Sequence, residues 1–240
     1  MSVVSYFNER FTDFRMLLFK PQMGARRLVR KAGLGTGVRL LALFAFLAGL
    51  LSVMLLAVGT LIGSLIKLVV GGGIDSVVEA AIGSILSIIA YIILFLPLII
   101  GLILVLVVWF GMVWGTAKLL GGKSDYGMHF GMLVYPIVLF MLLSAFILGV
   151  MNLVAAVFMP VIPILALIVV WGEALILLLL VLHCLWLKIT VTAEAHQFDM
   201  LRAGAAVVVP SALLGLASAI ILVVFSAILA TLVGLSIPTF

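Results

Sequence analysis

Four long runs of apolar residues occupy most of this chain and limit what it can fold into. They cover Val38–Ile66, Val77–Ala117, Phe130–Leu187 and Ala203–Leu235, and charged residues are rare inside them. Of the 240 residues, 67% are hydrophobic and 9% are charged, whereas soluble domains are about half apolar and a quarter charged. A water-soluble fold cannot bury this much apolar surface. The sequence therefore predicts an all-α, polytopic membrane helical bundle.

Two of these runs are too long for a single membrane crossing, which needs about 20 apolar residues. Asn152 and the proline-containing segment Met159–Pro163 divide the third run into two crossings joined by a short turn. The second run, 77–117, offers a break near Pro97 and Gly101. It is interpreted either as two crossings or as one crossing preceded by a helix that lies in the membrane interface.

The distribution of basic residues favours the second interpretation. Eight of the thirteen basic residues precede position 40, which places the N-terminus in the cytoplasm. Five crossings put the basic residues at 118, 123, 188 and 202 inside as well, which leaves only Lys67 outside. Six crossings would leave eight inside and five outside. The positive-inside rule thus predicts an outer C-terminus and five spans, at about 38–61, 97–118, 131–155, 162–187 and 207–231.

Residues 76–94 are predicted to form an outer interfacial helix before the second span. Small and polar residues recur at helical spacing on one side, opposite a broad face of valine and isoleucine; they are Ser76, Ala80, Gly83, Ser87 and Tyr91. Such a helix suits a partly inserted position in the interface. The alternative is a true span that packs through its small face.

Residues 1–37 are predicted to form a cytosolic, basic, amphipathic arm ahead of the five-span domain, 38–240. Phe7, Phe11, Phe14 and Leu18 share one helical face, which we expect to face the membrane, and Pro21 ends that helix. Four basic residues follow and predict binding to anionic lipid headgroups: Arg26, Arg27, Arg30 and Lys31. The same charges also orient the chain in the membrane.

The stretch Gly121–Pro136 is predicted to be a cytosolic turn followed by the entry into the third span. Together with the turn near residue 199 it forms the predicted partner surface, which comprises Lys123, Asp125, Tyr126, His129, His196, Asp199 and Arg202. Asp125 and His129 lie four residues apart and share a helical face. A metal site would need a further ligand such as His196, but the spacings match no metal motif, and no metal is predicted.

Four segments of the chain resemble the Yip family, the Rab-interacting, five-span membrane proteins. They are Leu17–Pro21 before the first span, Gly121–Tyr126 in the cytosolic turn, Phe130–Pro136 at the third span, and Leu201–Ala203 with Pro210 at the last span. The Asp-Leu-Tyr-Gly-Pro motif of the eukaryotic N-terminal domain is absent from the sequence, as is the long domain that carries it. The resemblance therefore implies a prokaryotic, archaeal-type member and does not extend to Rab binding.

Glu173 is the ionisable residue predicted to lie near the middle of a span. Such a group is costly in lipid unless it is neutral, hydrogen-bonded or in water. Ser144 and Ser218 are expected at a similar depth on other spans. These three residues are predicted to form an intramembrane polar cluster, in which a neutral Glu173 carboxyl bonds to one or both hydroxyls.

Two classes of function remain from the sequence. The first is a non-enzymatic, membrane-organising or trafficking-type adaptor that recruits cytosolic or membrane partners, in line with the Yip resemblance. The second is a small proton- or cation-linked transporter or channel that uses Glu173.

No nucleotide, nucleophile-elbow or zinc-protease motif occurs. We expect no enzyme activity, cofactor or nucleic-acid partner. The expected partners are anionic lipids and either an unidentified protein or a second copy of the chain. The prokaryotic plasma membrane is the expected location, or the Golgi or ER membrane if the chain is eukaryotic.

Overall fold

The computed structural model of the chain describes residues 3–70, 73–158 and 162–232, and within these ranges it is a bundle of α-helices without strands. The helices are α1 (Val3–Phe19), α2 (Pro21–Val29), α3 (Leu34–Val69), α4 (Asp75–Leu119), α5 (Tyr126–Phe158), α6 (Pro163–His196) and α7 (Met200–Leu232). Among the described residues, five helices, α3 to α7, are long and apolar enough to cross a membrane. The predicted all-α membrane architecture is confirmed.

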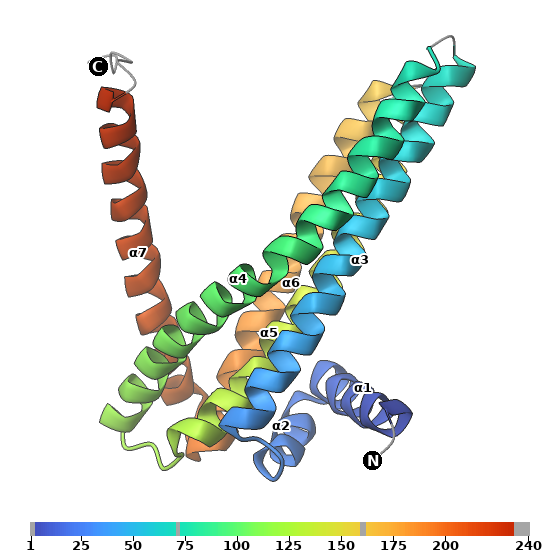
Figure 1. Cartoon of the computed structure of the whole chain (residues 1–240). Helices are drawn as coiled ribbons and strands as arrows, with labels where there is room; N and C mark the ends of the chain where they lie inside the picture. Colours follow the sequence, from blue (N-terminus) through green and yellow to red (C-terminus); the bar gives the residue numbers. More distant parts are fainter. Residues whose placement is uncertain (1–2, 71–72, 159–161, 233–240) are drawn as a thin grey trace.

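The three helices α3, α5 and α6 run side by side along the bundle, while α4 and α7 leave it over part of their length (Figure 1). The first half of α4 lies along α3, and its second half turns away towards the start of α7. The far half of α7 stands apart from the other helices. The short helices α1 and α2 fold against one end of the bundle. We call this the arm end; it also contains the α4–α5 and α6–α7 turns.

The boundary between the two helices of the arm lies where the sequence predicts it. α1 ends at Phe19 and Pro21 is at the first position of α2. A proline has no N–H to donate and clashes with the preceding turn of a helix, so it is tolerated at the start of a helix and ends a preceding one. The chain changes direction there, which brings α2 back against α1 and the bundle.

The separate interfacial helix predicted for Ser76–Leu94 needs correction, because α4 continues without a break through Pro97. One side of this segment packs on α3, but only part of the predicted small face belongs to it, because Gly83 and Ser87 are exposed. Ser84 Oγ lies 3.2 Å from Thr60 Oγ1, and the Tyr91 hydroxyl donates to the Phe46 carbonyl at 3.0 Å. The segment is therefore part of one long helix that contacts α3 through Ser84 and Tyr91, and whether it crosses the membrane or lies in the interface stays a prediction. At 45 residues α4 is about 68 Å long, well beyond the predicted span.

The best-packed core lies near the arm end. Phe44, Phe110, Phe130 and Tyr135 are buried there, and the rings of Phe110 and Phe130 meet edge to face with their centroids 5.1 Å apart. Away from this core the helices carry exposed isoleucine, leucine and valine on much of their surface. Those side chains suit a surface surrounded by lipid.

A close backbone contact joins α5 to the turn that precedes α3. A Cβ atom added at Gly131 of α5 would lie 2.5 Å from the Gly33 nitrogen and 2.8 Å from its carbonyl oxygen. Those neighbours are backbone atoms and cannot rotate aside. Only glycine at position 131 permits this approach.

We expect Gly131→Ala to lower the free energy of unfolding of the detergent-solubilised protein by about 1–3 kcal/mol, the usual range for overpacking. Gly204→Ala in α7 is the matched control, because nothing lies within 4 Å of the added Cβ. That control is expected to be neutral or to stabilise by up to about 1 kcal/mol, since glycine is a poor helix residue. Denaturant titration followed by circular dichroism measures both. Equal stability of the two variants would contradict the close contact.

Candidate functional site

The candidate site is the arm end, where charged side chains from distant parts of the sequence meet. Asp13 of α1 lies at its centre, with its carboxylate fully buried. The Arg27 Nε atom donates to Asp13 Oδ1 at 2.7 Å, Lys31 Nζ lies 3.3 Å from Oδ2, and Arg10 Nη1 lies 3.6 Å from Oδ2. A buried carboxylate is tolerated only when charge and hydrogen bonds compensate its lost hydration. Asp13 therefore joins α1 to α2 and to the turn after it.

Arg10 extends this network into the bundle. Its Nη1 atom donates to the Tyr135 hydroxyl at 2.5 Å, and Tyr135 is a fully buried residue of α5. The ring of Phe14 packs between Phe44 of α3 and Tyr135, with centroid distances of 5.2 and 5.6 Å. Polar and apolar contacts thus attach the arm to the bundle together.

The membrane-facing stripe predicted on α1 is wrong in its orientation. Phe14 is 4% exposed and Phe7 contacts the ring of Phe44, so both face the protein. Leu18 is half-buried against the same core. Phe11, at 58% exposure, is the member of the stripe that points outward. The apolar face is real, but α3 and α5 cover it in place of lipid.

Three of the four residues of the predicted lipid-binding set are engaged in ion pairs within the protein, and their binding to headgroups stays a prediction. Arg27 and Lys31 bind Asp13, Lys31 also binds Glu9, and Arg26 Nε donates to Glu194 Oε1 at 3.1 Å. Arg30 is exposed. The hydrogen bond and the charge of Lys31 lower the pKa of Glu9 below its ordinary value. That pair therefore contributes to docking above the ordinary glutamate pKa, and its contribution is lost as the pH falls through the lowered value.

The two turns at the arm end are closed by side-chain caps. Asp125 Oδ1 accepts from the Met128 N–H at 3.0 Å at the start of α5, and Asp199 Oδ1 accepts from the Arg202 N–H at 2.9 Å at the start of α7. Such caps satisfy N–H groups that lack a partner within the helix. Gly121, with a φ of 89°, makes the left-handed residue of the first turn. The predicted turn between two long helices is confirmed.

The structure brings His129 and His196 together inside the protein, which differs from the exposed partner surface that was predicted. Both are buried, and His196 Nε2 lies 3.0 Å from His129 Nδ1. One ring nitrogen must donate and the other accept, so the pair ties α5 to α6. Gly122 leaves room for the His196 ring, since any side chain there would collide with it. Among the described residues no group of three metal-ligating side chains occurs.

The other members of the predicted partner surface lie at or near the protein surface. Lys123 Nζ donates to Gln197 Oε1 at 3.1 Å, and Arg202 Nε lies 3.5 Å from Asp199 Oδ2. Asp125 is exposed, whereas the half-buried Tyr126 donates its hydroxyl to the Val107 carbonyl at 2.9 Å. Lys123, Asp199 and Arg202 thus remain available to a partner, with Asp125 beside them.

A hollow of about 370 Å³ opens between α2 and the α6–α7 turn. We call it the arm-end hollow; its polar lining consists of Gln22, Arg26, Thr190, Glu194, Gln197 and Asp199. The Arg26–Glu194 pair lies across it, and the side chain of Arg26 is 72% exposed. The hollow exists only because the arm is docked, since α2 supplies Gln22 and Arg26 and α6 supplies Thr190 and Glu194.

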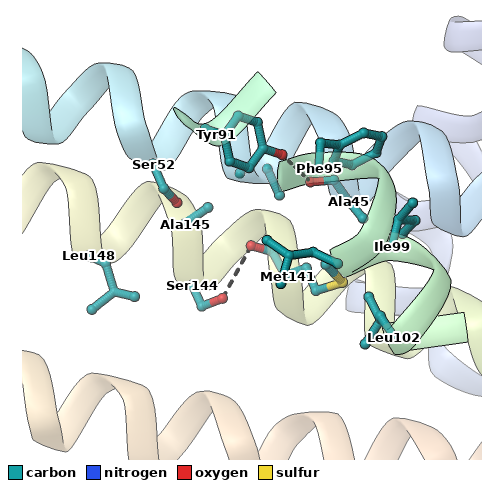
Figure 2. Close-up of a pocket in the computed structure, with 13 residues that line it drawn as sticks. Ala45, Ser52, Tyr91, Phe95, Ile99, Leu102, Met141, Ser144, Ala145 and Leu148 are labelled. Atoms are coloured by element: carbon teal, nitrogen blue, oxygen red, sulfur yellow. Dashed lines mark hydrogen bonds between the residues drawn. The ribbon is translucent and has the colours of Figure 1, made fainter. Parts of the chain in front are cut away.

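The predicted intramembrane cluster does not form. Ser144 lines a cavity of about 280 Å³ between α3, α4 and α5, where its hydroxyl donates to the Met141 carbonyl at 3.1 Å (Figure 2). Ser218 is exposed on α7. Glu173 is half-buried and has no hydrogen bond or ion pair to any other residue that the structure describes. The departure of α7 from the bundle separates Ser218 from the other two residues.

Sequence reasoning missed Arg10, Asp13 and Tyr135, the residues that fix the arm in place. A signal was present, because Arg10 and Asp13 lie one helical turn apart and Asp13 precedes Phe14 in the apolar stripe. A carboxylate next to an apolar face indicates either an exposed edge or a buried ion pair. Which of the two applies depends on Tyr135, which lies 122 residues after Asp13 in the chain.

We expect Asp13→Ala to release the arm from the bundle. The substitution leaves the largely buried Arg10 without its counter-charge, a change that typically costs about 3–5 kcal/mol. Hydrogen–deuterium exchange should rise across α1 and α2 while the spans stay protected. Thr12→Ala is the control, since Thr12 is exposed and bonds only to its own helix at Asn8. Unchanged exchange in Asp13→Ala would show that the ion-pair network does not hold the arm.

No protein-family model, curated protein or solved structure matches this chain.

Proposed function

We propose that this chain is a non-enzymatic integral membrane protein that presents a partner-binding surface at the membrane, a membrane-organising or trafficking-type adaptor of the kind its Yip resemblance implies. The observation that carries the proposal is the arm-end hollow. Two charged side chains, Arg26 and Glu194, face each other across it from segments 168 positions apart, and both are accessible. A surface with both signs of charge on a rigid support suits recognition of a protein, because charge complementarity selects partners.

The rigidity of this surface supports the proposal. The buried ion pairs of Asp13 attach α2 to α1, the Arg10–Tyr135 hydrogen bond attaches α1 to the bundle, and the His129–His196 contact holds the two helices that carry the turns. A surface ordered before binding loses less conformational entropy when the partner arrives. Lys123 and Arg202 lie beside the hollow through their contacts to Gln197 and Asp199.

An amphiphilic patch at the α1–α2 junction supports contact with the membrane surface. Phe19, Met23 and Trp186 are exposed there, and Lys20 lies with Met23 and Trp186 around one shallow hollow. Tryptophan and basic residues are both enriched at the headgroup level. In our proposal this patch takes the lipid role that the sequence suggested for the basic run after Pro21, and anionic headgroups are its ligands.

The proposed orientation has the arm end in the cytoplasm and the C-terminus outside. Of the thirteen basic residues, twelve belong to the arm, the turns at this end or the helix ends beside them, and the thirteenth, Lys67, lies near the other end of α3. This distribution favours a cytoplasmic arm end. The prokaryotic plasma membrane is the proposed location.

Reversal of one charge tests the proposed partner surface. Arg26→Glu sets a second carboxylate against Glu194, so we expect at least tenfold less of the partner to be retained from a cytosolic extract on full-length protein in liposomes. Like charges placed together at an interface cost several kcal/mol. Glu79→Gln is the control, because Glu79 is exposed near the opposite end of the bundle.

The same liposomes separate the adaptor from the transporter. If the protein is an adaptor, we expect the liposomes to show no specific proton or cation flux, either with the wild type or with Glu173→Gln. A specific flux that Glu173→Gln abolishes, with no cytosolic protein retained, would refute the proposed function.

Cysteine labelling tests the orientation. With Cys184 replaced, single cysteines at Asp125 and Gln197 should be protected from an impermeant thiol reagent added outside, and one at Gly73 should react. Gln197 serves as reporter in place of its neighbour His196, which is buried. Positions 72 and 240, also expected on the outer side, lie beyond the described residues. Reaction at 125 from outside would reverse the proposed topology.

A further inference from the structure

A further hollow in the bundle lies away from the arm end, between α3, α4 and α5. It measures about 640 Å³. We call it the Lys67 pocket; its lining consists of Leu56, Gly59, Thr60, Gly63, Ser64, Lys67, Ala80, Asn152, Ala155 and Ala156. Half of this lining is glycine or alanine, which is what leaves the space. The other half supplies a cation, two hydroxyls, a carboxamide and one leucine.

The polar groups are arranged in order of depth along α3. Lys67 lies in the last turn of the helix, and Thr60 lies seven residues earlier, about 10 Å along the axis. Ser64 lies between them, and Leu56 marks the inner side of the pocket. Along α3 the lining therefore changes from cationic at the helix end, through hydroxyl groups, to Leu56, while the backbone of Asn152 in α5 lies beside Gly59 towards the inner end.

Several of these polar groups have capacity left for a ligand. Lys67 forms no ion pair with any residue that the structure describes, and its side chain is exposed. Asn152 Nδ2 donates once, to the Leu148 carbonyl at 2.7 Å, and an amide nitrogen has two hydrogens. The nearest carboxylates along the chain, Asp75 and Glu79 of α4, do not line the pocket.

We propose that the Lys67 pocket binds one anionic phospholipid, in the leaflet opposite the arm. Its phosphate binds Lys67, its ester carbonyls accept from Ser64 and Asn152, and an acyl chain follows Leu56 and the apolar surface of α3 and α5. A free phosphate would satisfy Lys67 but would leave the inner, apolar part of the pocket empty. The depth order of the lining distinguishes a lipid from a soluble anion.

Native mass spectrometry of the full-length protein in detergent tests this with phosphatidylglycerol as the probe. One phosphatidylglycerol should bind in preference to phosphatidylcholine. Lys67→Gln should weaken phosphatidylglycerol binding about fivefold, because that is roughly what one basic residue contributes to the binding of an anionic lipid. Arg39→Gln is the matched control, because it removes the same charge from an exposed position at the opposite end of α3 and should leave binding unchanged.

A second variant tests the cavity independently of its charge. Ala155→Phe fills the pocket while Lys67 stays in place. We expect this variant to bind phosphatidylglycerol at least tenfold more weakly than the wild type, with an unchanged circular dichroism spectrum. Equal binding by wild type, Lys67→Gln and Ala155→Phe would overturn the proposal. So would displacement of the lipid by inorganic phosphate at the same concentration, which would make the pocket a simple anion site. If Ala155→Phe does not fold, the comparison of Lys67→Gln with Arg39→Gln still decides the outcome.

Discussion

The buried carboxylate of Asp13 is the interaction on which the arm end depends. It lies among Arg10, Arg27 and Lys31, and Arg10 also donates a hydrogen bond to Tyr135 inside the bundle. A lone carboxylate at this place would be very unfavourable, so the three cations must stay close, and they hold α1, α2 and α5 in one arrangement. The arm-end hollow follows from that arrangement, because α2 forms one of its walls.

The two ends of the bundle are stabilised in different ways. Near the arm end, aromatic residues such as Phe44 and Phe130 form a close-packed core, and the backbone of Gly33 passes against Gly131. Towards the other end the helices meet through small residues and leave the Lys67 pocket between them. Helices in lipid associate through packing and hydrogen bonds, without the hydrophobic effect that closes apolar gaps between helices in water. A gap between the helices can therefore persist there. This contrast underlies both proposals, a protein partner at the arm end and a lipid in the Lys67 pocket at the other end.

Polar residues inside the predicted spans are mostly satisfied by the backbone. Ser144 bonds to the Met141 carbonyl and Thr116 to the Met112 carbonyl, each within its own helix. A serine or threonine in a helix can always reach a carbonyl three or four residues earlier, so a polar residue at mid-span depth does not need a partner on another helix. Glu173 has no such local solution, and the exposed position of Ser218 leaves it without the hydroxyl that the sequence suggested.

The sequence by itself determined the class of fold, the number of long apolar helices and the places where the chain turns. These follow from composition, from helical period and from proline and glycine, which act over a few residues: Pro21 starts α2, and Gly121 permits the turn before α5. The tertiary structure decided which faces meet. Phe14 faces Tyr135 in place of lipid, Arg26 pairs with Glu194, and the histidines at 129 and 196 face each other in place of solvent. An amphipathic pattern shows only that a face is apolar or charged. Whether lipid or protein covers that face depends on contacts between residues more than a hundred positions apart, as for Phe14 and Arg26, and local sequence does not encode them.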